Sequence, residues 1–361
     1  MVIRSLSKKV VFTGCPLDCD EQHDAIQEKL HLPYSGPIAD DPLNPVVGML
    51  AAMVPPAQWR VGESVPVPGW LRPLPPVEEQ ARINVDNFIS FIDQDGCRRY
   101  AQAVQHIVKD NVLPDFPCLI AVDHALTGGA YTALADHYGR QHLSLLIIDS
   151  HTDAVPMSLL ANAILYDADT NSRSVYDRDD PYLHQRTESY NASSFIHHLL
   201  AEKILDPRDL FIIGISDYPE KRAFRINDTR IKEYVDVYSA LKREGATLIT
   251  RQDCQMQPTK VKSLLKKIRT PYVYLSIDMD IGARNAVEGV RFKNWQGLGE
   301  KQIYRLASMI SECRGRDLEL VGLDITEINP RTAGQPLGAT MDRTYEVAAN
   351  LIKMMAFETA M

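Results

Sequence analysis

The chain of 361 residues has no apolar run of the roughly 20 residues that a transmembrane helix needs. It also has no stretch in which lysine and arginine gather, and its formal net charge is −8. Without a basic surface, the electrostatic attraction to phosphates that drives nucleic-acid binding is missing. We therefore expect neither a membrane nor a nucleic acid as partner, and small molecules or peptides instead.

Cysteines are few and scattered, six in 361 residues. The spacing of Cys15 and Cys19 is compatible with metal binding, but no second pair or nearby histidine completes a tetrahedral site. The segment Met1–Val10 carries basic residues without the apolar stretch of a secretion signal. These features predict reduced, buried or loop thiols in a cytoplasmic protein.

Short runs rich in valine, isoleucine and leucine alternate with helical patterns. Runs that are apolar on both faces are typical of a parallel sheet covered by helices on both sides. The alternation predicts a three-layer α/β/α sandwich, and we expect a single domain over residues 1–361. The predicted strands are Val10–Cys15, Cys118–Val122, Leu143–Ile148, Leu210–Ile215, Ala246–Ile249, Tyr272–Ile277 and Leu318–Leu323. The predicted helices are Gly129–Tyr138, Ala192–Lys203, Ile231–Arg243, Pro258–Ile268, Glu300–Cys313 and Thr344–Phe357.

Two segments interrupt the alternation. Residues 32–76 are dense in proline and glycine, which predicts ordered irregular chain on the surface or reaching towards a neighbouring molecule. Residues 154–190 contain an acidic and polar run and directly follow residues 149–153, a motif of two aspartates and a histidine. We expect this second segment, an insertion, to overhang the mouth of the active site.

Acidic residues and histidines directly follow three of the predicted strands. One strand is followed by Asp-Ser-His-Thr-Asp at 149–153, a second by Asp-Met-Asp at 278–280, and a third by Asp123 and His124. Ligand sites of open α/β sheets lie beyond the carboxyl ends of the strands, and residues two apart in extended chain point the same way. The candidate metal ligands are therefore His124, Asp149, His151, Asp153, Asp278 and Asp280.

Four carboxylates in one place repel each other, and divalent cations between them remove that cost. Carboxylate oxygens mixed with two imidazoles suit Mn²⁺, with Zn²⁺, Fe²⁺, Co²⁺ or Ni²⁺ as alternatives. Two ions about 3.5 Å apart would lower the pKa of a bridging water and supply hydroxide near neutral pH. Each motif alone is more often a turn or a helix cap. Three of them at three strand ends favour a two-metal centre.

These segments resemble the ureohydrolase family, which includes arginase, agmatinase, guanidino-acid hydrolases and formiminoglutamase. Residues 149–153 are similar to its Asp-Ala-His-x-Asp motif, residues 276–280 to Ser-x-Asp-x-Asp, and Asp123 with His124 to Gly-Gly-Asp-His. The similarity continues at 14–18 and at 322–330, where the family has a late strand ending in Glu-Val-Asn-Pro. The resemblance implies an arginase-like sandwich with a mostly parallel sheet of roughly eight strands.

The resemblance also implies roles for individual residues. Glu327 corresponds to the carboxylate that pairs with the substrate guanidinium, and a carboxylate offers two coplanar acceptors to that planar cation. By analogy we also expect a homo-oligomer. One manganese ion would be held by His124, Asp149, Asp153 and Asp278, and the other by Asp149, His151, Asp278 and Asp280.

Several positions depart from the family pattern. Ala121 and Val122 replace the Gly-Gly before Asp-His, Ala283 and Arg284 replace a frequent Asp-Pro, and residues 288–298 differ from the usual pocket loop. Backbone near the metal site therefore carries side chains that the family avoids.

A further departure concerns proton transfer. Arginases carry a histidine proposed to shuttle protons to the leaving amine, and Asn191, which cannot titrate, stands at that position. Either His184 in the insertion takes this role, or a metal-bound water and Asp153 suffice. The arginase residues that hold the amino-acid end of the substrate are not identifiable in 154–190, so free arginine is not predicted as the substrate.

The sequence thus predicts a dinuclear-manganese hydrolase that cleaves a guanidino C–N bond with metal-activated hydroxide and releases urea and an amine. One alternative is hydrolysis of a formimino group or another amidine. Another is a peptide arginine or a natural-product guanidine, for which the loop with Arg291, Lys293 and Trp295 leaves room. A non-enzymatic alternative is a metal-binding regulatory relative, against which the intact ligand set argues.

Overall fold

The computed structural model describes residues 8–31, 38–282, 287–313 and 318–358. Its centre is a sheet of eight parallel strands in the order β2-β1-β3-β8-β7-β4-β5-β6. This confirms the predicted α/β class and strand number. The strands are β1 Val10–Cys15, β2 Trp59–Val61, β3 Phe116–Ala121, β4 Leu143–Ile148, β5 Leu210–Ile215, β6 Thr247–Thr250, β7 Tyr272–Asp278 and β8 Glu319–Thr326, and a small antiparallel pair consists of β9 Pro336–Leu337 and β10 Thr340–Met341.

Both faces of the sheet are buried, as the apolar runs predict. In β4, Leu145 and Ile147 belong to the core on one face, whereas Leu146 and Ile148 belong to the core on the other. Side chains of a strand alternate between its two faces, so a strand covered on both sides must be apolar at every position. In the pairing of β4 with β7, Ile148 lies beside Ile277.

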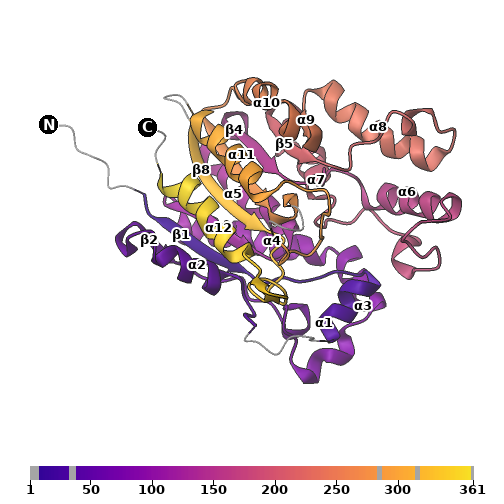
Figure 1. The fold of residues 1–361 in the computed structure, drawn as a ribbon, viewed down its shortest axis with the longest axis horizontal. Coiled ribbons are helices and arrows are strands. Elements are labelled where there is room, and N and C mark those ends of the chain that lie inside the picture. Colours follow the sequence, from indigo (N-terminus) through magenta and orange to yellow (C-terminus); the bar gives the residue numbers. More distant parts are fainter. Residues whose placement is uncertain (1–7, 32–37, 283–286, 314–317, 359–361) are drawn as a thin grey trace.

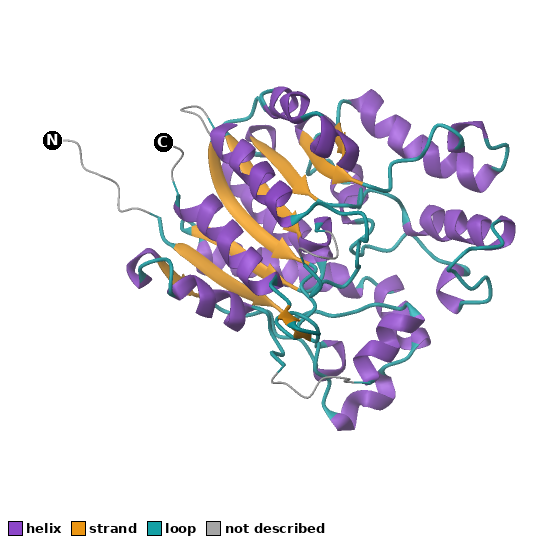
Figure 2. Ribbon diagram, in the orientation of Figure 1, coloured by secondary structure: helices purple, strands orange, loops and turns teal. Residues whose placement is uncertain are grey.

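Helices form the two outer layers of the sandwich, as Figures 1 and 2 show. Buried side chains of α3, α4, α5 and α7 pack on one face of the sheet, and those of α2, α10, α11 and α12 pack on the other. Within the described part of the chain, no helix combines the length and the apolar character needed to cross a membrane. The helices are α1 His23–Leu30, α2 Leu43–Ala51, α3 Val85–Asp93, α4 Gly96–Ile107, α5 Thr127–Tyr138, α6 Met157–Thr170, α7 Phe195–Ala201, α8 Thr229–Glu244, α9 Arg251–Met256, α10 Pro258–Leu265, α11 Glu300–Cys313 and α12 Thr344–Ile352.

The proline-rich segment is more regular than we predicted from its composition. Part of residues 32–76 forms α2, in which Val46, Val47 and Leu50 are buried at helical spacing. Another part forms β2, which pairs with β1 at the sheet edge. The expectation of irregular chain was therefore wrong for these parts. Apolar residues that face the core determined the local structure, and the prolines limit the elements to short lengths.

The insertion 154–190 contains α6, which packs against α8. Figure 1 shows both helices to one side of the sandwich, away from the strands. Side chains of both helices line a cavity that also contains several of the predicted metal ligands. The insertion therefore forms part of the wall of the candidate site.

The close packing of α5 on α4 depends on Gly129. A Cβ atom added there would lie 1.9 Å from the carbonyl oxygen of Ala101, which is backbone and cannot move away cheaply. We expect Gly129→Ala to lower the free energy of unfolding by about 1–3 kcal/mol, measured by urea denaturation. Gly48→Ala in α2, with nothing within 4 Å of the added atom, is the control and should stabilise by up to about 1 kcal/mol. Equal effects of the two changes would contradict this account.

Candidate metal centre

The six predicted metal ligands converge at the carboxyl edge of four adjacent strands. Asp278 ends β7 and Asp280 follows it, residues 149–153 follow β4, and His124 follows β3. β8 lies between β3 and β7 and is followed by Glu327. Parallel strands all end at the same edge of the sheet, so distant parts of the chain deliver their side chains to one place.

The first group of side chains surrounds the ring of His124. Its Nδ1 atom faces one oxygen of each of three buried carboxylates. The distances are 2.8 Å to Asp153 Oδ2, 3.1 Å to Asp278 Oδ2 and 3.3 Å to Asp149 Oδ2. An imidazole nitrogen and three carboxylate oxygens thus point at a common position.

The second group shares Asp149 with the first. His151 Nδ1 lies 2.8 Å from Asp280 Oδ2 and 3.7 Å from Asp149 Oδ1. In each set of three, ligand atoms lie within 4.8 Å of one another, a spacing that suits one metal ion. The sets are His124, Asp149 and Asp153, and Asp149, His151 and Asp280.

Asp149 and Asp278 each have a structural role in addition to facing this centre. Asp149 Oδ1 accepts the backbone N–H of His151 at 2.7 Å, and Asp278 Oδ1 accepts that of Asp280 at 2.8 Å. Turns of this kind explain the spacing of two residues within each motif. The second oxygen, Oδ2, of each aspartate remains directed at His124. The turns therefore use Oδ1 of each aspartate and leave Oδ2 directed at the predicted centre.

A chain of hydrogen bonds orients the ring of His124. Its Nε2 lies 2.9 Å from Ser276 Oγ, and Ser276 in turn bonds Asp324, a buried acid of β8. A serine hydroxyl that donates to a carboxylate accepts from the ring, so Nε2 carries a proton and Nδ1 is left for the centre. Asp324 is an acid inside the apolar run of β8, and this unusual position was the sequence signal for its role beside Ser276. Our sequence prediction missed that role.

The charges of the centre call for a cation. Burial raises the pKa of Asp149 well above its ordinary value, and the charges of Asp153 and Asp280 raise it further. Burial opposes a charged His124, but the nearby carboxylates of Asp149, Asp153 and Asp278 outweigh this and raise its pKa. Among the described atoms that are buried and lack a hydrogen-bond partner are His124 Nδ1, Asp149 Oδ2 and Asp280 Oδ2. Two divalent ions fit this donor set because they would satisfy these atoms and offset the repulsion.

Backbone geometry is unusual at two residues of this site. Asp153 has φ 48° and Glu327 has φ 58°, in the left-handed region that side chains other than glycine's rarely adopt. Each such residue costs about 1–3 kcal/mol, which the surrounding packing must offset. The conformation aims both carboxylates into the same cavity.

Glu327 is held by the protein through one of its two oxygens. Oε1 accepts the backbone N–H of His124 at 3.0 Å and lies 3.4 Å from the guanidinium of Arg291. That guanidinium is 5% exposed, and it also bonds Asp123 at 3.0 Å and the carbonyl of Cys19 at 3.0 Å. Oε2 is buried and lacks a partner among the described residues. The carboxylate therefore offers one free oxygen to the cavity.

The cavity above the centre has a volume of about 950 Å³. Its inner end contains His151, Asp153, Asp278, Asp280 and Glu327. Its outer wall combines apolar and aromatic side chains with charged ones such as Asp167, Glu220 and Arg222, and comes from α6, α8, the loop after β5 and the loop 288–298. These wall residues include Leu160, Ile164, Tyr166, Ile226, Ile231, Tyr234 and Phe292.

His184 and Asn191, the two other positions that the sequence linked to proton transfer, lie away from the inner end of the cavity. His184 is exposed and outside the cavity lining, and its Nε2 lies 2.8 Å from the carbonyl oxygen of Arg178. Asn191 is buried, and its Oδ1 accepts a hydrogen bond from Ser194. Only Asp153, of the residues predicted for this role, stands at the inner end of the cavity.

The remaining departures from the family pattern have structural roles. Val122 is fully buried, and its carbonyl oxygen lies 3.4 Å from Arg291 Nη1. The loop 288–298 pairs with the strand end through Val290 and Ile328 and so places Arg291 beside Glu327. Ala283 and Arg284 lie outside the described residues.

Asp217 is a residue of the site that our sequence prediction missed. It accepts from the backbone N–H of Thr152 at 3.0 Å and from the Thr152 hydroxyl at 2.8 Å. It thereby fixes the turn between His151 and Asp153. A single acid in a loop far along the chain carries no motif, so its role became visible only in the fold.

Metal binding at this centre should release protons. The pKa of Asp149, Asp278 and His124 is raised in the absence of a cation, so these groups hold protons that a metal ion must displace. The apparent affinity for Mn²⁺ is therefore expected to rise as pH increases from about 6 to 8. Calorimetric titration in two buffers of different ionisation enthalpy measures the protons released. Equal heats in both buffers would refute proton displacement.

Comparison with known proteins agrees with this geometry. The model of the arginase family matches residues 76–357. Among solved structures, the chain is similar to arginase from Bacillus caldovelox, with 16% identity, a TM-score of 0.57, and coverage of 98% of this chain and 100% of that one. It is also similar to formimidoylglutamase from Bacillus subtilis, with 14% identity, a TM-score of 0.55, and coverage of 97% and 87%.

A third similar structure is proclavaminate amidino hydrolase from Streptomyces clavuligerus, with 16% identity, a TM-score of 0.53, and coverage of 98% of this chain and 91% of that one. No curated protein matches the sequence. At these identities the solved structures establish the fold, while the family model covers most of the chain. The chain therefore belongs to the arginase family of hydrolases, which act on amidino and guanidino C–N bonds.

Proposed function

We propose that this protein hydrolyses a guanidino C–N bond and releases urea and an amine. The observation that carries the proposal is a pair of His/Asp groups that share Asp149, with His151, Asp153, Asp280 and the unpartnered Glu327 Oε2 of the described site lining one cavity. The ligand set proposed for two manganese ions is His124, Asp149, His151, Asp153, Asp278 and Asp280. When bound, such ions would supply hydroxide near neutral pH.

The protein's own residues would bind and orient the substrate. Glu327 Oε2 would accept an N–H of the planar cation, while Arg291 and the His124 N–H hold Oε1 in place. Burial raises the pKa of Glu327 and Arg291 opposes that effect, with Asp278 raising it further. Offsetting the charge of Asp278 by a cation would favour the ionised Glu327 that a cationic substrate needs.

Asp153 is our candidate for the proton transfer that the leaving amine requires. It lines the cavity, and its Oδ2 lies 2.8 Å from His124 Nδ1. His184 would need to move from its bond with the Arg178 carbonyl to reach the centre, so Asp153 is the better candidate of the two.

Hydrolysis of a formimino group or another amidine is a second candidate function. With Oε1 of Glu327 already bonded, the protein does not present two free oxygens to a guanidinium fork. An amidine has fewer N–H donors and needs fewer acceptors than a guanidine, so one free oxygen suits it as well.

The cavity supports a substrate larger than the reacting group alone. A cavity of about 950 Å³, lined by tyrosines and aliphatic side chains together with polar residues such as Asp167 and Asn171, accommodates an extended body, as in a peptide arginine or a natural-product guanidine. Arg222 is the only arginine or lysine in the lining, and it pairs with Glu220 at 2.9 Å. A carboxylate at the far end of the substrate would therefore find no free cation within the described lining.

The proposal also covers the oligomeric state of the protein and its location in the cell. Self-association into a homo-oligomer is expected by analogy with the family. Cytoplasmic location would suit Cys15, Cys19, Cys97 and Cys118, which are buried free thiols.

The function is tested with purified, manganese-loaded protein and a panel of guanidines and amidines, with urea, amine and formamide as measured products. Arginine, agmatine, guanidinobutyrate, formiminoglutamate and arginine peptides form the panel. With the best substrate, Glu327→Gln should lower kcat/KM by about 100-fold or more, because it removes a charge-assisted bond in a buried site.

Glu220→Gln is the matched control, since Glu220 lines the same cavity but pairs with Arg222 at the surface. It should change kcat/KM by less than about threefold. No product from any member of the panel would refute the proposal, and formamide without urea would select the amidine reaction. An unchanged rate in Glu327→Gln would remove Glu327 from the substrate contact.

A further inference from the structure

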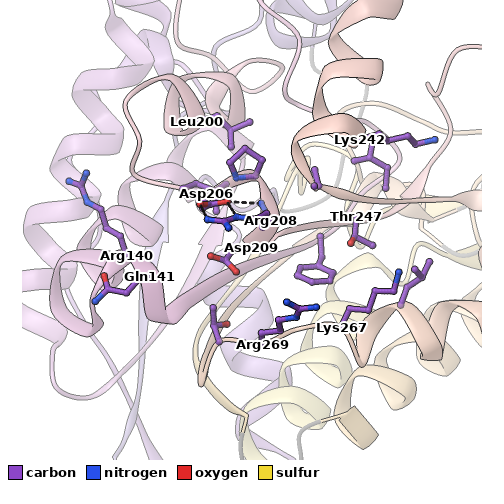
Figure 3. A pocket seen from close by; sticks show the side chains of 18 of the residues that line it. Arg140, Gln141, Leu200, Asp206, Arg208, Asp209, Lys242, Thr247, Lys267 and Arg269 are labelled. Atoms are coloured by element: carbon purple, nitrogen blue, oxygen red, sulfur yellow. Dashed lines mark hydrogen bonds and ion pairs between the residues drawn. The ribbon is translucent and has the colours of Figure 1, made fainter.

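A second cavity lies at the opposite edge of the sheet from the candidate metal centre. It has a volume of about 1060 Å³, and its lining comes from the helices and loops that lead into β4, β5, β6 and β7 and from the first residues of β5 and β6. Figure 3 shows Arg140 and Gln141 on one side of this hollow and Lys242 and Thr247 on the other. Since the metal ligands follow the carboxyl ends of strands, the two cavities are separated by the length of the sheet. We call this second cavity the amino-edge cavity.

The lining of the amino-edge cavity is strongly basic, although the protein as a whole is acidic. Seven of its residues are lysine or arginine and only two, Asp206 and Asp209, are acidic. The chain carries a formal net charge of −8, so a random patch of surface would have an acidic excess. Basic side chains from four connections of the fold are therefore concentrated in one hollow.

Three of these basic residues already pair with acids. Arg208 bonds Asp206 at 2.7 Å, as the dashed lines in Figure 3 show. Lys260 bonds Asp253 at 2.6 Å, and Arg140 lies 3.8 Å from Asp136. These pairs compensate their own charge and add little to the attraction of a ligand.

Four basic residues of the lining form no ion pair within the described part of the chain. They are Lys203, Lys242, Lys267 and Arg269, all of them exposed to solvent. Asp209 is the one acid of the lining that remains beside them without an ion pair of its own among the described residues. Concave surfaces of one charge focus the electric field and raise the local concentration of counter-ions. The uncompensated charge of the cavity is positive.

We propose that the amino-edge cavity binds a small polyanion, of the charge and size of a triphosphate. A compact ligand with several negative groups can balance the four basic residues of the lining that form no ion pair among the described residues, whereas a single phosphate carries less charge than they do. Arginine and lysine both bind phosphate oxygens through charge-assisted hydrogen bonds. A hollow of this volume is in the range of small-molecule sites rather than of extended polymer surfaces. This site is independent of the proposed hydrolysis.

The proposal is tested by calorimetric titration of the metal-loaded protein at low ionic strength with two probes, inorganic tripolyphosphate and ATP. The test variant is Lys267→Glu/Arg269→Glu. Its matched control is Lys301→Glu/Arg305→Glu, which makes the same change of charge at exposed positions of α11 outside both cavities. Heat from any metal chelation by the probes is common to both variants.

We expect both probes to bind the wild-type protein with similar affinity, and the affinity to fall as salt is added. Lys267→Glu/Arg269→Glu should raise Kd by about tenfold or more for each probe. The control should leave Kd within about twofold. Absence of binding by either probe, an equal loss in the control, or binding of ATP alone would overturn the proposal.

Discussion

The repulsion between buried carboxylates at one edge of the sheet is the constraint on which the rest of the site depends. Asp149, Asp153, Asp278 and Asp280 come from the ends of two strands, and His124 from a third. The parallel sheet brings them together, and turns that use one oxygen of Asp149 and Asp278 hold them there. Such a cluster is stable as a set of charges only when cations offset it. The folded protein therefore has an unfavourable electrostatic energy at this edge of the sheet, which bound cations would remove.

Around this centre the chain differs from its family in the loop that supplies Arg291. That buried guanidinium bonds Asp123 and also contacts one oxygen of Glu327. It holds the carboxylate through Oε1 and partly offsets its charge, while Oε2 has no partner among the described residues. Glu327, which Arg291 holds, and side chains of α6 and α8 line the same cavity. The predicted metal ligands lie at or just after the ends of strands, while a loop and the insertion supply much of the cavity wall.

The sequence predicted the fold well because its strands are buried on both faces and read as continuous apolar runs. It also predicted that residues 149–153, 278–280 and His124 would meet, because motifs at parallel strand ends share one edge. It failed for β2 and α2, where proline content masked short apolar patterns. It did not reveal Asp217 or the contact of Arg291 with Glu327. Asp217 and its partner Thr152 are far apart in the chain, as are Arg291 and Glu327. Only tertiary packing brings the members of each pair together.

Electron paramagnetic resonance of the Mn²⁺-loaded protein tests the central claim most directly. The account predicts two ions per chain with the spectrum of an exchange-coupled pair, since Asp149 belongs to both groups. Asp149→Asn should abolish the coupled spectrum, while Asp167→Asn, which lines the same cavity but belongs to neither group, should keep it. Binding of only one ion, or of two magnetically isolated ions, in the wild-type protein would contradict the dinuclear centre.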